Sequence, residues 1–191
     1  MPRKRKLQVE IMPQVMIVVA VILITIPARL AISWIAAAVV HELCHILATM
    51  LSGARILSVR IGANGTTIYT STIKSGIGIL CSLAGPFGGF LVALFCRKLP
   101  ILALCALIQS TYNLLPFSQL DGGRAISELL HLICSATTAD MLCRTIEMLT
   151  LAVLTILAFG GSFVLELGYT PIVMVVILVV RLAVVKIPCK H

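Results

Sequence analysis

The sequence predicts an all-α polytopic membrane protein with about six transmembrane helices and a small membrane-associated β-hairpin, built as one domain over residues 1–191. Of the 191 residues, 60% are hydrophobic and only 12% are charged, which is about half the charged share of a soluble domain. The mean hydropathy is +1.11. A water-soluble domain of this size could not cover its surface with polar groups, so the composition excludes that class of protein.

Six apolar runs are each close to the roughly 20 residues that cross the hydrocarbon of a bilayer as a helix. They lie near residues 11–27, 30–51, 76–96, 99–117, 141–160 and 169–187. The basic start before the first run would also suit a cleaved signal peptide. We expect a retained helix instead, because the run leads within a few residues into the next span and no A-x-A-like cleavage site is present.

Lysine and arginine divide unequally between the two sides of the predicted membrane. If the N-terminus is cytoplasmic, twelve basic residues fall in inside segments and three, Arg29, Arg97 and Lys98, fall outside. The positive-inside rule therefore predicts a multi-pass protein of the cell membrane with both termini in the cytoplasm. The net charge of +8 then reflects this topology and attraction to the anionic headgroups of the lipid bilayer, and no nucleic-acid partner is expected.

Two short β-branched segments, 56–61 and 66–72, follow the second apolar run. Ala63-Asn64-Gly65 separates them, and Asn-Gly is a strong signal for a two-residue hairpin turn. The pattern predicts a β-hairpin on the cytoplasmic side, beside the end of the second helix. A plain surface loop is the alternative.

His41-Glu42-Leu43-Cys44-His45 lies inside the second apolar run. Ionisable groups at bilayer depth are energetically expensive, so their presence argues for a function. Residues i and i+4 share one face of a helix, so His41 and His45 can bind one metal ion while Glu42 stays close enough to activate a water molecule. A purely structural histidine pair is the alternative.

The fourth run ends in a segment that should break the helix. Pro116 removes a backbone donor and disfavours helix at the residue before it, and Gly122-Gly123 is expected to loosen the chain after Asp121. A broken helix at membrane depth survives only where it is buried in protein or faces water. Such a break would suit the presentation of Asp121 to a metal ion. The alternative is that Asp121 is the N-cap of the following helix.

Two other patterns favour helix packing. Gly85 and Gly89 in the third run are four residues apart and form a small-residue face that lets another helix come close; contact with a substrate is the alternative. Arg144 and Glu147 open the fifth run at i and i+3, which is typical of an ordinary ion pair on a helix surface.

The candidate residues suit metal-assisted hydrolysis. Three protein ligands with an open fourth position are typical of catalytic zinc, and His41, His45 and Asp121 would be those ligands. Zinc lowers the pKa of a bound water to about 7, and Glu42 would take its proton and pass it to the leaving amine. Asn113 would donate to a developing oxyanion or hold the substrate backbone, or merely bond to a neighbouring helix.

These motifs resemble the site-2 protease family of intramembrane zinc metalloproteases, in particular its short bacterial branch that includes the sporulation sigma-factor processing protease. The resemblance rests on His41–His45, on Asn113…Pro116…Asp121-Gly122, and on Gly85-x-x-x-Gly89. It implies that the two histidines and the aspartate bind Zn²⁺, that Glu42 is the catalytic base, and that six helices and a β-hairpin form a single metalloprotease domain.

The chain departs from the pattern of that branch at two places. Cys44 stands where the family often has glycine, which affects the shape of the pocket. Ser118-Gln119 replaces prolines that are common in the branch, which affects the linker to Asp121.

The sequence therefore predicts a zinc metalloendopeptidase that cuts a membrane-associated protein substrate in or near a transmembrane segment, as in regulated intramembrane proteolysis. The alternative is a non-proteolytic membrane protein that transports or senses a divalent metal through the same side chains. That function would need a polar path across the bilayer, and the remaining spans carry few polar groups.

Overall fold

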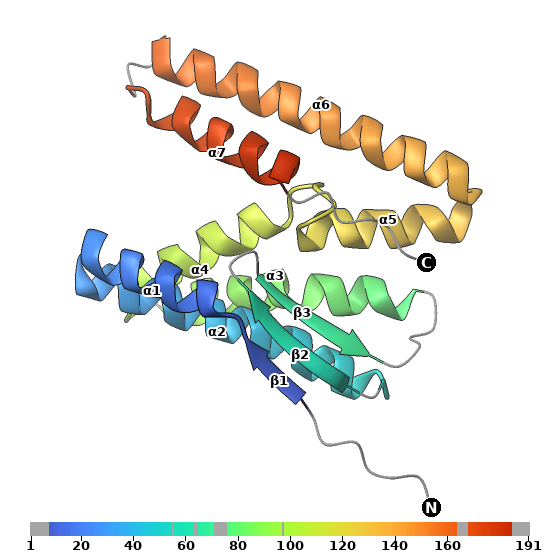
Figure 1. The fold of residues 1–191 in the computed structure, drawn as a ribbon, viewed down its shortest axis with the longest axis horizontal. Coiled ribbons are helices and arrows are strands. Elements are labelled where there is room, and N and C mark those ends of the chain that lie inside the picture. The colour runs from blue at the N-terminus through green and yellow to red at the C-terminus, as the bar shows by residue number, and fades with distance from the viewer. Residues whose placement is uncertain are drawn as a thin grey trace, which may run out of the picture.

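The structure, a computed structural model, describes residues 8–54, 56–62, 65–70, 76–96, 98–163 and 168–184. These residues form a mainly helical protein with one small sheet (Figure 1). In chain order the elements are β1 (Gln8–Ile11), α1 (Pro13–Thr25), α2 (Ala28–Leu51), β2 (Ile56–Gly62), β3 (Gly65–Thr70), α3 (Ile77–Phe95), α4 (Pro100–Asn113), α5 (Asp121–Ile133), α6 (Ala136–Phe163) and α7 (Thr170–Val184).

Each of the six apolar runs overlaps one helix, and prolines set several of the boundaries. Pro13 and Pro100 are the first residues of α1 and α4, where the missing N–H would have no helical partner and the fixed φ suits the first turn. The chain also breaks as predicted between Asn113 and Asp121. The seventh helix, α5, follows this break.

Within the described residues, three helices are long and apolar enough to cross a membrane: α2, α3 and α6. Helices α1, α4 and α7 contain 13, 14 and 15 residues, or about 20–23 Å at 1.5 Å per residue, which is short of the ~30 Å of hydrocarbon. The structure thus supports three candidate spans, and six remain a prediction. The chain ends, 1–7 and 185–191, lie outside the described residues, so their cytoplasmic location also stays a prediction.

The predicted hairpin is confirmed. Strands β2 and β3 pair antiparallel, with Gly62 opposite Gly65, although Ala63 and Asn64 of the predicted turn lie outside the described residues. Strand β1 was not predicted from the sequence; it pairs parallel with β2 and makes the sheet three-stranded in the order β1-β2-β3. Parallel strands are not joined by a tight turn, so the sequence next to β1 carries no turn signal that would indicate its partner.

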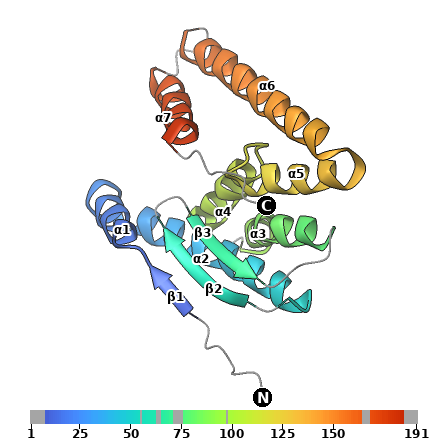
Figure 2. The ribbon, with the colours of Figure 1, turned by 45° about the vertical axis from the view of Figure 1, so that its right-hand side comes forward.

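Helices α2, α3 and α4 pack against one another, with the sheet on one side and the α6–α7 pair on the other (Figures 1 and 2). Their common core contains Ala37, Cys105 and Ala106, with Val92 and Leu102 packed against it. Most of these side chains are small, which allows close approach where lipid offers no hydrophobic drive for helix association. Helix α5 connects this unit to α6.

Two neighbouring glycines of α3, Gly88 and Gly89, lie against different helices. A Cβ at Gly89 would lie 2.0 Å from Ser110 Oγ of α4, and a Cβ at Gly88 would lie 2.2 Å from Cys44 Sγ of α2. These distances are shorter than real contacts, so a methyl group at either position requires the neighbouring side chain to move. The thiol of Cys44 thus fills the space above Gly88, which shows how α2 accommodates a residue larger than glycine at position 44.

We predict that Cys44 and Gly88 are energetically coupled. Gly88→Ala should lower the free energy of unfolding by about 1–3 kcal/mol through overpacking, and Cys44→Gly in the same chain should recover most of this loss. Thermal unfolding of the detergent-solubilised single and double variants measures the coupling as a double-mutant cycle. Gly160→Ala on α6 is the matched control, because nothing lies within 4 Å of its added Cβ. Additive effects of the two substitutions would contradict the prediction.

Candidate metal centre

One face of α2 carries both histidines into the protein interior. The buried residues Ala37, His41, His45 and Thr49 follow one another at intervals of four and therefore lie on one side of the helix. This side packs against α3 and α4. The imidazoles are consequently enclosed by protein, with only 5% and 9% of His41 and His45 exposed.

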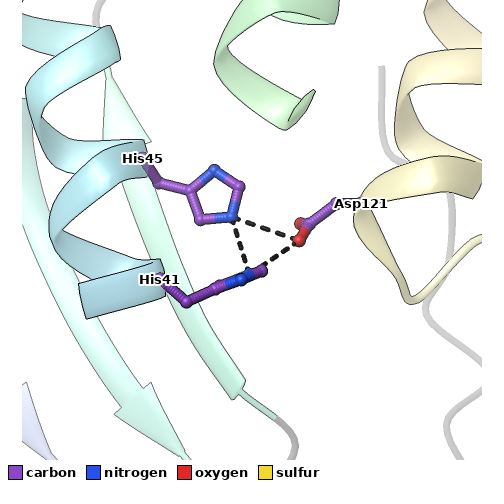
Figure 3. A group of neighbouring side chains, drawn as sticks. All are labelled: His41, His45 and Asp121. Carbon is purple, nitrogen blue, oxygen red and sulfur yellow. Dashed lines mark hydrogen bonds and ion pairs between the residues drawn. The ribbon is translucent and has the colours of Figure 1, made fainter. Parts of the chain in front are cut away.

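Asp121 reaches this face from α5, 80 residues further along the chain than His41 (Figure 3). Its Oδ2 lies 3.0 Å from Nε2 of His41 and 3.1 Å from Nε2 of His45, and the two nitrogens are 3.1 Å apart. Ligand atoms of a tetrahedral zinc site with bonds of 2.0–2.1 Å lie about 3.3 Å apart. The three predicted ligands therefore come together in a group that could hold a metal ion.

His45 is held from behind by the backbone of α3. Its Nδ1 lies 2.7 Å from the carbonyl oxygen of Cys81, and because a carbonyl only accepts, Nδ1 is the donor. In the neutral ring this leaves the lone pair on Nε2, which faces His41 and Asp121, as a metal-binding histidine requires. Nδ1 of His41, by contrast, is buried and has no hydrogen-bond partner within the described part of the chain.

Asp121 is the first residue of α5, and the N-cap position belongs to Leu120. The alternative that Asp121 is merely an N-cap is therefore wrong. Burial disfavours its charge, but the interactions with the imidazoles of His41 and His45 outweigh burial and lower the pKa of Asp121 below its usual value. The carboxylate is thus ionised at neutral pH, the form that binds metal. Its Oδ1 lies 3.9 Å from Nη1 of Arg124, one turn further on.

Gly122 and Gly123 do not loosen the chain, contrary to the prediction. Both are buried residues of α5, and the positive φ angles of described glycines occur elsewhere, at Gly53, Gly76 and Gly168. A Cβ at Gly122 would lie 2.1 Å from the carbonyl oxygen of Leu114, and a Cβ at Gly123 would lie 2.0 Å from that of Phe117. The glycines are needed because the backbone of the preceding loop lies directly against the first turn of α5.

Gly85 of α3 forms a wall of the same site. A Cβ on this residue would lie 2.2 Å from Nε2 of His45 and 2.7 Å from Nε2 of His41, the two nitrogens that face Asp121. The bare Cα of Gly85 therefore leaves the space beside the candidate ligand atoms free. The sequence pattern suggested helix packing or substrate contact here, and the structure places Gly85 against the imidazoles.

The other two candidate residues lie on the helices that form the site. Glu42 directly follows His41 on α2 and is half-buried. Asn113 is the last residue of α4, and its Nδ2 donates to the carbonyl oxygen of Gln109 at 3.1 Å. This hydrogen bond lies within α4 and does not reach a neighbouring helix. It uses one of the two N–H groups of the Asn113 amide. The chemical roles of Glu42 and Asn113 stay predictions.

Two groups beside the site, the carbonyl of Cys81 and the guanidinium of Arg124, were not among the residues predicted from the sequence. The contact of Cys81 joins residues 36 positions apart through a backbone oxygen, which leaves no trace in residue types. Arg124 had a local signal, because its spacing of three from Asp121 on a helix predicts proximity.

Comparison with known proteins identifies the fold. No protein-family model and no curated protein sequence matches the chain. The structure, however, is similar to that of a site-2 protease from Methanocaldococcus jannaschii, with a TM-score of 0.66 over 96% of this chain and 92% of that chain, at 18% sequence identity. The two proteins share a fold. The predicted, mainly helical architecture agrees with this similarity, whereas membership of the site-2 protease family and of its sporulation branch stays a prediction.

We predict that Gly85→Ala blocks metal binding without removing any candidate ligand. The added methyl group would occupy the space next to both Nε2 atoms, so the affinity for Zn²⁺ should fall at least about 100-fold, the upper range seen when the surroundings of metal ligands change. Chelator competition on the purified protein measures this affinity. Gly160→Ala again is the control and should bind Zn²⁺ as the wild type does. Wild-type affinity in Gly85→Ala would show that the metal does not bind between these imidazoles.

Proposed function

We propose that the protein is an intramembrane zinc metalloendopeptidase that hydrolyses a peptide bond in or near a transmembrane segment of a partner protein. The observation that carries the proposal is the meeting of His41, His45 and Asp121 in the interior of a protein whose α2 is apolar enough to span a membrane. Buried ionisable groups are expensive there unless they serve a site. The likeness in fold to a site-2 protease supports the same function.

The donor set fits Zn²⁺. Two imidazole nitrogens and one carboxylate oxygen are typical of catalytic zinc, whereas Mg²⁺ and Ca²⁺ prefer oxygen ligands alone. Three protein ligands leave a fourth position open. When bound there, zinc would polarise the scissile carbonyl and make a bound water acidic.

The remaining steps belong to side chains of this protein. Glu42 would accept the proton of the attacking water and deliver it to the leaving nitrogen. Asn113 would use its second amide N–H to stabilise the oxyanion or to hold the substrate backbone. The carbonyl of Cys81 holds the ring of His45, so the ring does not have to reorient during the reaction.

The substrate we propose is a membrane-associated protein in extended conformation. Strand β3 pairs with β2 along one side and is the last strand of the sheet within the described residues, so its outer edge can pair with an added strand. A substrate helix would first have to unwind, because its peptide groups are bonded within the helix. The proposed orientation, with several spans and both termini in the cytoplasm, puts this sheet on the cytoplasmic side.

Glu42→Gln tests the proposed function. The amide cannot accept the proton, so cleavage of a model transmembrane substrate in liposomes should fall at least about 100-fold, while the zinc content of the purified protein stays at the wild-type level. Asp121→Asn is the companion variant and should lose zinc as well as cleavage. A Glu42→Gln variant that cuts at the wild-type rate would reject the assigned base.

The same liposomes also distinguish the rival function. A wild-type protein that binds zinc and releases it across the bilayer, but cuts no substrate, would be a metal transporter and not a protease.

A further inference from the structure

The loop between α4 and α5, residues 114–120, is anchored by the α6–α7 pair. Phe117 in this loop is completely buried and forms a cluster with Leu120 and with Leu178 of α7, against which Leu151 and Leu154 of α6 also pack. The loop ends at Asp121. Its position, and therefore that of the carboxylate, depends on contacts with helices that carry none of the candidate ligands.

A side chain of α6 also bonds directly to this loop. The backbone N–H of Ser118 donates a hydrogen bond to Oε1 of Glu147, 29 residues further along the chain. The sequence pattern predicted an ordinary surface ion pair between Glu147 and Arg144, but no such pair exists between these two described residues. The carboxylate turns to the loop instead. A hydrogen bond to a charged acceptor is roughly twice as strong as a neutral one.

The polar and apolar contacts come from one face of α6. Leu151 and Leu154 follow Glu147 by four and seven residues, so the three side chains point in the same direction. Glu147 binds the backbone of the loop beside Phe117, and the leucines pack on the cluster that contains Phe117. This face of α6 thus holds the loop at adjacent points.

The loop in turn lies against the first turn of α5 without free space. A Cβ on Gly123 would lie 2.0 Å from the carbonyl oxygen of Phe117 and 2.8 Å from the backbone nitrogen of Ser118. The same carbonyl accepts a hydrogen bond from the N–H of Leu120 at 2.8 Å. A shift of Ser118 must therefore move the turn that begins with Asp121.

We propose that Glu147 is a positioning residue of the metal centre. By accepting the hydrogen bond of Ser118 it holds residues 114–120 against α5, and so keeps Oδ2 of Asp121 in reach of both imidazoles. This inference rests on the proposed metal site. It also gives a reason why Ser118 stands where the branch that this chain resembles commonly has proline. A proline at position 118 has no N–H to donate, whereas serine allows this bond.

Four variants of the full chain in detergent test the inference. Glu147→Leu removes the acceptor, and Glu147→Gln keeps a side-chain oxygen that can accept the same bond. Ser118→Ala keeps the backbone donor, and Arg144→Leu removes a charge from the exposed side of the same helix. The first measurement is the affinity for Zn²⁺ by chelator competition, and the second is hydrogen exchange of the peptide that covers residues 114–120 in metal-free protein.

Glu147→Leu should weaken Zn²⁺ binding at least about tenfold, the lower range for residues that orient metal ligands, and should speed exchange of the loop amides. Glu147→Gln, Ser118→Ala and Arg144→Leu should stay within about twofold of the wild type in affinity, so that rescue by glutamine distinguishes positioning from loss of packing. Wild-type affinity in Glu147→Leu, or equal weakening by Glu147→Gln, would overturn the inference.

The two measurements also distinguish failure of the inference from failure of the proposed function. A wild type that binds no Zn²⁺ would reject the metalloprotease and, with it, a positioning role at a metal centre. A wild type that binds Zn²⁺, together with loop exchange that Glu147→Leu leaves unchanged, would reject the role of Glu147 alone.

Discussion

The contact between the carboxylate of Asp121 and the imidazoles of His41 and His45 is the interaction on which the rest of the structure depends. It joins α5 to α2 across 80 residues of sequence and gathers three ionisable groups among apolar helices. Such groups are costly to bury unless they are paired or bind a metal. One carboxylate oxygen is brought to two nitrogens by three features: the packing of α3 against both α2 and α5, the break after α4, and the short helix α5.

Close backbone approach makes this convergence possible. Gly85 brings α3 against the imidazoles, while Gly122 and Gly123 bring the loop after α4 against α5. In each case the neighbour is a ring nitrogen or a backbone carbonyl, neither of which can yield to a methyl group without moving the site. Helices in lipid gain little from hydrophobic association. Close packing and polar contacts must therefore fix the positions of the ligands.

Helices α6 and α7 stand apart from the sheet and from α2 and α3 (Figure 2). Much of the surface of α6 is apolar and exposed, for example Ile156 at 71% and Met148 at 66%, as expected of a helix whose outer side faces lipid. Its inner face holds residues 114–120 through Glu147, Leu151 and Leu154. These helices carry none of the candidate ligands, yet they border the segment that positions one.

The sequence by itself determined what depends on local order. Composition predicts a membrane protein, the spacing of His41 and His45 puts both rings on one helix face, Pro116 predicts the break, and Asn64-Gly65 predicts the hairpin. Helix periodicity, proline stereochemistry and turn preference act over a few residues, so they can be inferred from neighbours in the chain.

Only the tertiary structure decided what depends on distant contacts. It showed that Asp121 meets the histidines, that Gly122 and Gly123 are helical and tightly packed, that β1 adds a third strand, and that Glu147 turns to Ser118 and not to Arg144. Within the described residues it also showed three helices that are long and apolar enough to cross a membrane, where the sequence predicts six spans. Each of these results is set by atoms that approach from elsewhere in the chain, and residue spacing carries no record of that approach.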